Sequence, residues 1–309
     1  MMNWHSEEVD ALVRRALAED VGSGDATTAA IVPPGTPAKA IIIARQTLVC
    51  AGLPIAESVF RALDAKMHIG CLHNDGSFVE PGAELIEIAG EAQAILTGER
   101  TALNFLAHLC GVATLTRRFV EQLAGTHARI RDTRKTTPGL RELEKYAVKC
   151  GGGTNHRFGL FDAILIKENH IAIAGGVKAA LDRAHAYTSL KMPAPRAASA
   201  YDAAGLDPEV VGPGPLSVQI EVRDEGELRE ALEAGAEAVL LDNMTPEEAK
   251  HCVALVRSLR RDCVIEISGG ITLDNVRAYA ETGANFLSSG ALTHSAPSAN
   301  LSLLVERVG

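Results

Sequence analysis

The chain has 309 residues, a net charge of −9 and a hydrophobic fraction of 47%. That length suits one large domain or two medium ones, and the composition is that of a globular protein rather than a disordered one. Because the net charge is negative, the sequence argues against a general nucleic-acid binder, which needs an extended basic face.

The sequence also lacks the signals of a secreted protein, a membrane protein and a zinc protein. The start, "MMNWHSEEVD", lacks a basic region followed by an apolar run, so no secretory signal is expected. No apolar stretch is long enough to span a bilayer, so we expect no membrane partner. The six cysteines form no CxxC pair and no zinc spacing. Together these features favour a cytoplasmic protein with free thiols.

The first third of the chain predicts a mixed α and β domain. Ser6 can cap a helix whose apolar face includes Val9, Val13 and Leu17. A β-branched run in "AKAIIIARQTLVCAG" predicts a strand, and a second strand follows two turn signals in "HNDGSFVEPGAELIEIAG". Residues 92–123 have a helical pattern, with a break expected at Gly111.

From residue 128 onward, strand-like runs alternate with helical segments. The runs are "RIRDTR", "AILIK", "VQIEV", "AVLLD", "VIEIS" and "NFLSSG". Helices are expected near 139–149, after 175–176, near 225–234, and opening at Thr245 and Thr272. Such repetition indicates parallel strands with crossover helices. Unbroken repetition favours a barrel over an open sheet, and six strands would make it smaller than the common eight-stranded form.

The expected strands end in polar or small residues, and none ends in a plain core residue. These residues are Arg134, Lys135, Lys167, Glu221, Asp242, Ser268, Ser289 and Gly290. In parallel α/β folds, binding and catalytic groups collect at the carboxyl ends of the strands. The sequence therefore predicts an active site on one rim of the barrel.

The rim is rich in cations, although the chain as a whole is acidic. Residues 129–167 contain nine Lys or Arg against four Asp or Glu. Such a cluster is typical of a site that holds an anion with several charges. The glycines after 268 and 289 let backbone N–H groups approach a phosphate. Glu221 and Asp242 could bind ribose hydroxyls or Mg²⁺, or face a developing positive charge. A phosphoribosyl donor fits all of these features.

The segment "DTRKTTPGLRELEKYAVKCGGGTNHRFGLFDAILIKENHI" resembles the signature of the quinolinate phosphoribosyltransferases, the carboxylating nicotinate-nucleotide pyrophosphorylases. "TGERTALNFLAHLCGVAT", "LLDNM", "ISGGIT" and "SSGALTHSAP" resemble further family segments in the expected order. The resemblance implies an open-faced α/β sandwich domain at 1–114, an incomplete α/β barrel of about six strands at 115–292, and a segment at 293–309 that packs back on the first domain. It also implies a homodimer and a Mg²⁺-dependent reaction. In that reaction quinolinate and phosphoribosyl pyrophosphate give nicotinate mononucleotide, pyrophosphate and CO₂, a step of NAD biosynthesis.

The resemblance also implies roles for particular residues. Arg134, Lys135, His156, Arg157 and Lys167 match the contacts to quinolinate and pyrophosphate, and Thr133 stands beside them. Arg100 matches an arginine that reaches the neighbouring subunit's site, and Glu221 and Asp242 match an acidic pair near the ribose and, indirectly, the metal. The 5-phosphate loops correspond to Ser268, Gly269 and Gly270, and to Ser289, Gly290 and Ala291. Lys135, Lys167, Glu221 and Asp242 are expected to be catalytic.

Two departures from the family stand out. The family often has Glu-Val-Glu where this chain has Gln219-Ile220-Glu221, and we expect Gln219 on the outer face of its strand. The segment of residues 189–216 is longer than the corresponding segment expected for the family. It joins a helix to the next strand, so the part from Pro193 to Pro215 is predicted on the barrel face opposite the active site.

Other interpretations stay open. A paralogue of the same fold could act on nicotinate or another base, and a non-catalytic barrel could bind a phosphorylated metabolite. Lys167 could instead form a Schiff base, although a lysine among cations fits anion binding better. Lys145 and Lys149 are expected on a solvated helix face.

Overall fold

The computed structural model describes residues 2–4, 6–190 and 217–307, and the chain divides into two compact units. The first comprises Met1–Arg117, Glu142–Gly152 and Ala296–Gly309, and the second comprises Arg118–Arg141 and Gly153–Ser295. The expected loop from Pro193 to Pro215 lies outside the described residues. Among the described residues, no helix combines the length and the apolar character needed to cross a membrane.

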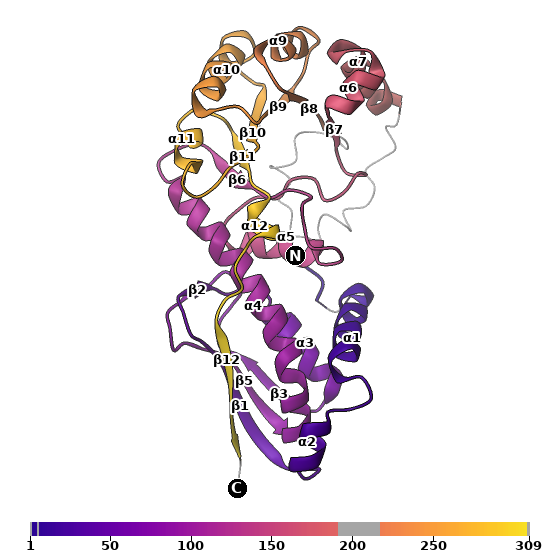
Figure 1. The fold of residues 1–309 in the computed structure, drawn as a ribbon, viewed down its shortest axis with the longest axis vertical. Coiled ribbons are helices and arrows are strands. Elements are labelled where there is room, and N and C mark those ends of the chain that lie inside the picture. Colours follow the sequence, from indigo (N-terminus) through magenta and orange to yellow (C-terminus); the bar gives the residue numbers. More distant parts are fainter. Residues whose placement is uncertain (1, 5, 191–216, 308–309) are drawn as a thin grey trace. The chain divides into compact units, whose positions relative to one another are not determined.

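The first unit is built on a four-stranded antiparallel sheet in the order β12-β1-β5-β3 (Figure 1). Its strands are β1 (Pro37–Ala44), β3 (His68–Cys71), β5 (Glu84–Glu91) and β12 (Leu301–Arg307). Strands β2 (Leu48–Val49) and β4 (Phe78–Val79) form a separate pair. The C-terminal strand β12 pairs with β1, so the last segment of the chain completes the sheet of the first unit.

The first unit also contains helices, and its apolar core draws on both the helices and the sheet. The helices are α1 (Glu7–Val21), α2 (Ala26–Ile31), α3 (Leu53–Leu63), the long α4 (Ala92–Gln122) and α5 (Arg141–Cys150). Ser6 caps α1 as predicted, because its hydroxyl accepts a hydrogen bond from the backbone N–H of Val9 at 3.3 Å. Phe60 of α3, Leu106 of α4 and Ile42 of β1 are all completely buried.

The predicted break at Gly111 is wrong, because α4 runs through it without interruption. A Cβ at Gly111 would lie 2.2 Å from the carbonyl oxygen of Pro297, on the segment that leads into β12. Glycine is therefore needed for a close approach of two backbones, and helix termination plays no part. The predicted solvation of Lys145 is also wrong. Only 2% of this lysine is exposed, because it lies on the buried side of α5 with Leu143 and Val148.

The second unit contains a six-stranded, wholly parallel sheet in the order β6-β11-β10-β9-β8-β7. The strands are β6 (Arg129–Arg131), β7 (Ile164–Ile166), β8 (Val218–Val222), β9 (Ala238–Asp242), β10 (Val264–Ser268) and β11 (Phe286–Ser288). Strands β6 and β7 form the two edges and are not paired with each other. The sheet is thus an incomplete barrel, which confirms the predicted fold class.

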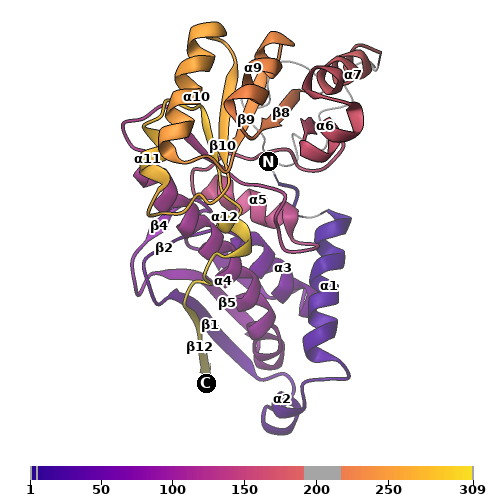
Figure 2. The same cartoon turned by 45° about the horizontal axis from the view of Figure 1, so that its top comes forward.

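Crossover helices follow the barrel strands, and α9 and α10 lie on the outer side of β8 to β10 (Figure 2). The helices are α6 (Glu168–Ala174), α7 (Val177–Leu190), α9 (Glu225–Glu233), α10 (Pro246–Leu259), α11 (Val276–Ala280) and α12 (Ala291–His294). Thr245 begins α10 as predicted, with a reciprocal capping box to Glu248. The helix expected at Thr272 starts later, at Val276, because the side chain of Asn275 first accepts the N–H of Thr272 in a turn.

Candidate active site

The strand register places the polar residues of the barrel on one face. Residues directly paired on neighbouring strands share a face, and positions two apart along a strand do so as well. Arg131 pairs with Ser288, Ser288 with Ser268, and Ser268 with Asp242. Two positions earlier along the strands, and so on the same face, Glu266 and Glu221 both pair with Leu240. The opposite face carries apolar residues such as Ile130, Leu287, Ile267 and Leu241.

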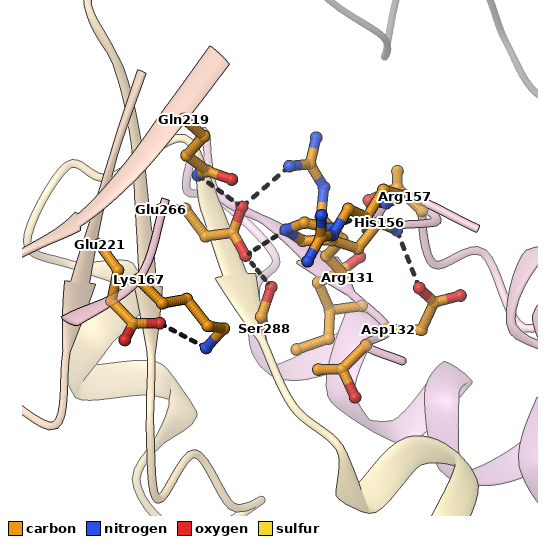
Figure 3. Close-up of polar contacts among 12 residues, drawn as sticks. Arg131, Asp132, His156, Arg157, Lys167, Gln219, Glu221, Glu266 and Ser288 are labelled. Carbon is orange, nitrogen blue, oxygen red and sulfur yellow. Dashed lines mark hydrogen bonds and ion pairs between the residues drawn. The ribbon is translucent and has the colours of Figure 1, made fainter. Parts of the chain in front are cut away.

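At the edge of the sheet, Lys167 and Glu221 form a close ion pair. The Lys167 Nζ lies 2.6 Å from Glu221 Oε2, and the lysine side chain is about half exposed while the glutamate is nearly buried (Figure 3). Lys167 follows β7 directly and stands as the residue before α6. The structure therefore brings together two predicted site residues that are 54 positions apart in the chain.

The other predicted cations surround the ends of β6 and the segment after Thr154. Arg134 and Lys135 are exposed, and Arg157 is partly buried. Burial, together with the nearby guanidinium of Arg134, lowers the pKa of Arg157. A bound anion beside Arg157 would favour its charged form and offset this effect. The Lys135 carbonyl accepts the Thr293 hydroxyl at 2.9 Å, which ties the loop after β6 to α12.

The turn at residues 156–159 holds its position through four successive backbone N–H groups. His156 N–H donates to Asp132 Oδ1 at 2.8 Å, and Arg157 N–H donates to Nδ1 of the His156 ring at 2.7 Å. Asp162 accepts the next two, from Phe158 at 2.5 Å and from Gly159 at 2.8 Å. Because these amides are already bonded within the chain, an anion near this turn must be held by side-chain cations.

The glycine loop after β10 shows the opposite arrangement. The N–H groups of Gly269 and Gly270 donate to no acceptor within the described part of the chain. Gly269 has φ of +97° and packs on Asn243, whose Oδ1 would lie 2.2 Å from an added Cβ. Only glycine fits this close approach in the left-handed region. The loop after β10 thus presents unbonded amides, which is the arrangement expected of a phosphate cradle.

The second predicted loop, at residues 289–291, is tightly fixed. The hydroxyl of Ser289 donates to the carbonyl of Ile271 at 2.8 Å, which joins this loop to the one after β10. A Cβ on Gly290 would lie 3.0 Å from Cδ of Lys135, so the lysine stem passes directly over this glycine. The small residue therefore lets a rim cation approach the start of α12.

A buried carboxylate that the sequence analysis missed lies beneath the rim. Glu266, on β10, is completely buried (Figure 3). It accepts hydrogen bonds from Arg131 Nη1 at 2.9 Å, from Gln219 Nε2 at 3.1 Å and from the Ser288 hydroxyl. Burial alone would raise the pKa of Glu266, but His156, Arg131 and the bonds from Ser288 and Gln219 lower it to about 2.

These contacts overturn the expectation that Gln219 lies on the outer face. Gln219 and Glu221 are two positions apart, so they share a face, and Gln219 points to Glu266 inside the barrel. The same period of two could have found the buried network, because Arg131, Gln219 and Glu266 are polar residues inside otherwise apolar strands.

The described residues offer carboxylates to a metal but no complete cage. No group of three His, Cys, Asp or Glu side chains in residues 2–4, 6–190 and 217–307 could hold a metal ion. Glu221 is paired with Lys167, and Asp242 Oδ2 accepts the side-chain amide of Asn243 at 2.7 Å. Mg²⁺ is usually bound through one or two carboxylates plus substrate phosphates, and this donor set fits that mode.

The remaining predicted residue, Arg100, belongs to the first unit. It is exposed on α4 and lines a cavity of about 390 Å³ with Leu103, Asn104, Ala107 and the 298–301 segment. The cavity brings the guanidinium of Arg100 and the amide of Asn104, both on α4, next to the polar residues Ser298 and Asn300 that lead into β12.

Comparisons with known proteins cover nearly the whole chain. The family model "Quinolinate phosphoribosyl transferase, N-terminal domain" matches residues 25–110, and the corresponding C-terminal domain matches 112–194 and 204–304. A probable nicotinate-nucleotide pyrophosphorylase [carboxylating] of Bacillus subtilis is 38% identical over 96% of this chain and 93% of its own length.

Solved structures give the same picture. The nicotinate-nucleotide pyrophosphorylase of Francisella tularensis is 37% identical, with a TM-score of 0.85 over 97% of this chain and 96% of that one. Human nicotinic acid phosphoribosyltransferase superposes with a TM-score of 0.58 over 98% of this chain and 75% of that one, at 14% identity. The latter likeness concerns the fold alone.

Proposed function

Because this chain belongs to the quinolinate phosphoribosyl transferase family, we propose that it transfers the phosphoribosyl group of phosphoribosyl pyrophosphate to quinolinate. The reaction releases pyrophosphate and CO₂ and forms nicotinate mononucleotide, a step of NAD biosynthesis. The observation that carries the proposal is the single polar face of the barrel, where cations, carboxylates and unbonded glycine amides meet.

The two carboxylates of quinolinate suit the side-chain cations of the rim. Arg134, Lys135, Arg157 and Lys167 are the proposed contacts to these carboxylates and to the pyrophosphate, with Thr133 and His156 in the same group. The amides of residues 156–159 are bonded within the chain, so the anion charge falls to the side chains. Charge-assisted bonds from such side chains are roughly twice as strong as neutral ones.

The 5-phosphate of the donor suits the glycine loops. We assign it to Ser268, Gly269 and Gly270 and to Ser289, Gly290 and Ala291, because the amides of Gly269 and Gly270 have no acceptor among the described residues. A phosphate oxygen could accept these N–H groups without displacing a bond that the fold already makes.

Glu221 and Asp242 suit the reacting centre. As pyrophosphate leaves, the anomeric carbon of the ribose becomes positively charged, and a nearby carboxylate stabilises that charge. Lys167 is ion-paired with Glu221, and a substrate carboxylate could draw the lysine away from it. These two carboxylates would also face a Mg²⁺ ion bound to the diphosphate, and the ion would neutralise the leaving group.

Three rival functions are less well supported. A Schiff-base lysine needs a desolvated, unpaired amine, whereas Lys167 is half exposed and ion-paired with Glu221. A barrel that only binds a metabolite would not need the Glu221 carboxylate beside Lys167. A paralogue that acts on nicotinate would need cations for one carboxylate only, while the rim provides several.

The direct test supplies phosphoribosyl pyrophosphate, Mg²⁺ and carboxyl-labelled quinolinate and measures released CO₂. We expect release that depends on both the donor and Mg²⁺. Nicotinate in place of quinolinate tests the paralogue, because nucleotide formed from nicotinate would favour that rival. Binding of the donor without release of CO₂ or pyrophosphate would favour the non-catalytic barrel. We also propose a cytoplasmic location, which recovery of the activity in the cytoplasmic fraction of lysed cells would test.

We also propose a homodimer in which Arg100 of each subunit serves its partner's site. A two-fold dimer would then contain two equal composite sites. Arg100→Ala and Glu221→Ala homodimers should each be nearly inactive. In a mixed dimer one site carries both substitutions and the other carries neither. Random exchange makes about half of the dimers mixed, so activity should recover to roughly a quarter of wild type.

The control for that experiment is an independent measurement of subunit exchange, for example by differently tagged chains. No recovery despite proven exchange would place Arg100 within its own subunit's site, or would limit it to holding the dimer together. Either result leaves the assignment of the reaction itself untouched.

A further inference from the structure

The imidazole ring of His156 lies between two fixed groups. Its Nδ1 accepts the N–H of Arg157 at 2.7 Å, and its Nε2 lies 3.5 Å from Glu266 Oε1. A backbone N–H can only donate, so Nδ1 must carry a lone pair in this arrangement. The ring proton is therefore on Nε2, on the side that faces the buried carboxylate (Figure 3).

The carboxylate of Glu266 cannot turn to another partner. Arg131 and Gln219 both donate to Oε2, and the Ser288 hydroxyl donates to Oε1, the oxygen nearest the histidine. The three donors come from β6, β8 and β11, so most of the barrel sheet fixes the orientation of this group. Arg131 is itself held, because its guanidinium carbon lies 3.4 Å from the centroid of the Phe286 ring.

Burying an ion pair of this kind brings little or no stability compared with apolar side chains of the same size. Arg131 is only 8% exposed and Glu266 is not exposed at all, so both have lost most of their hydration. A role in folding alone gives no reason to keep them. What the network does achieve is one fixed direction for the His156 ring, and the ring in turn fixes the backbone of Arg157.

We propose that Glu266 is a positioning residue for the transfer reaction: it holds His156 as the neutral Nε2–H tautomer, and that ring sets the Arg157 backbone so that its guanidinium meets a substrate carboxylate. The inference rests on the proposed function for its last step only. Asp132 assists from the other side, because it accepts the N–H of His156 itself. Arg157 is held further by its bond from Nη1 to the Ala163 carbonyl at 3.0 Å.

The first experiment reads the tautomer directly and does not need activity. The protein is labelled with ¹⁵N at its ten histidines, and long-range ¹H–¹⁵N correlation spectra are recorded near neutral pH. The His156 signals are identified by their loss in His156→Gln. We expect a protonated Nε2 and an unprotonated Nδ1. A proton on Nδ1 in the wild-type chain would overturn the proposal.

The second experiment replaces Glu266 by Gln, which keeps the shape and removes the charge. A matched control is Glu144→Gln in the first unit. Glu144 is likewise completely buried and accepts from a histidine, His108 Nε2, at 2.8 Å. In Glu266→Gln the ring loses the charge that fixes its direction, so Nδ1 should no longer be kept on the Arg157 N–H and His156 should show a mixture of tautomers. Glu144→Gln should leave the His156 signals as in the wild type.

Kinetics then separate positioning from stability. In Glu266→Gln, KM for quinolinate should rise about 10- to 100-fold, since a misplaced contact weakens substrate binding. A purely structural role would instead lower kcat per total protein through a smaller folded fraction and leave KM unchanged. That second outcome, or an unchanged tautomer, would overturn the proposal. If the variant does not fold, the His156 tautomer of the wild-type chain still tests the proposal. Failure of wild-type CO₂ release would refute the reaction and leave the tautomer result standing.

Discussion

The two sheets of this protein bury different chemistry. In the antiparallel sheet of the first unit, every buried strand residue that the structure describes is apolar, for example Ile42 on β1 and Ile86 on β5. The parallel sheet of the second unit buries five polar or charged side chains on its strands. They are Arg131, Gln219, Glu221, Glu266 and Ser288.

This difference separates stability from chemistry. Burial of apolar surface contributes roughly 25 cal/mol per Å², so the first sheet stabilises its unit through packing. Buried charges lose the free energy of their hydration, and only close pairing with opposite charges offsets that loss. The second sheet therefore gains less stability from its interior. Polar residues inside a barrel are therefore best explained by what they hold at its rim. Three predictions test this difference between the two sheets, in order from the largest expected effect to the smallest.

Removal of rim cations should affect activity and spare the fold. Lys135→Ala and Arg157→Ala should each weaken transition-state stabilisation by about 2–4 kcal/mol, or roughly 30- to 1000-fold in kcat/KM. Unfolding of Lys135→Ala in denaturant should match the wild type, because this lysine is exposed. Lys250→Ala, an exposed cation on α10, is the control with normal turnover. Near-normal activity of Lys135→Ala with quinolinate would contradict the substrate assignment.

The polar interior should make the second unit sensitive to acid. The pKa of Glu266 is lowered to about 2 from the ordinary glutamate value of 4.5. The ionised group therefore stabilises the folded state above pH 4.5, and this contribution is lost as the pH falls from 4.5 to 2. The full contribution is on the order of 3 kcal/mol.

The measurement is the free energy of unfolding at several pH values between 2 and 6, on the scale of ordinary carboxyl titration. Glu266→Gln should show a shallower fall than the wild type across the window from 4.5 to 2. The exposed Glu233→Gln, on α9, should follow the wild-type curve. Equal slopes for all three proteins would mean that Glu266 is not ionised in the folded protein.

In the first unit, the effect of a substitution on the free energy of unfolding should depend on packing alone. Gly111→Ala forces a Cβ toward the Pro297 carbonyl, which belongs to a backbone and cannot rotate away. We expect a loss of about 1–3 kcal/mol in unfolding free energy. Gly98→Ala on the same helix meets the side-chain ends of Leu63 and Phe60 at 2.9–3.1 Å, which can shift. If Gly111→Ala were no less stable than Gly98→Ala, the close approach would not matter.

Local patterns in the sequence predicted many elements correctly. "AVLLD" and "VIEIS" coincide with β9 and β10, since short β-branched runs between turn signals leave few alternatives. Thr245 marked the start of α10 because a capping box is a local signal. The cation cluster of the sequence already included Arg157, with His156 beside it, and the resemblance to the family added predicted roles for these residues.

The same local patterns could not predict contacts between segments that are distant in the sequence. Gly111 looked like a helix break, because nothing in the neighbouring sequence reveals that Pro297 packs against it. Helix α6, only seven residues long, was not predicted at all. Glu266 was not predicted as a site residue, because its partners Arg131 and Gln219 are 135 and 47 positions away in the chain.

The sequence by itself determined the strand–helix alternation, the six barrel strands and the cation-rich rim, because these follow from short-range periodicity and from charge. Only the tertiary structure decided which polar residues meet. Strand register places Glu266 against Arg131, Gln219 and His156, and it leaves the Gly269 and Gly270 amides unbonded among the described residues. Register is set by the pairing of whole strands across the sheet, so no single segment of the chain contains it.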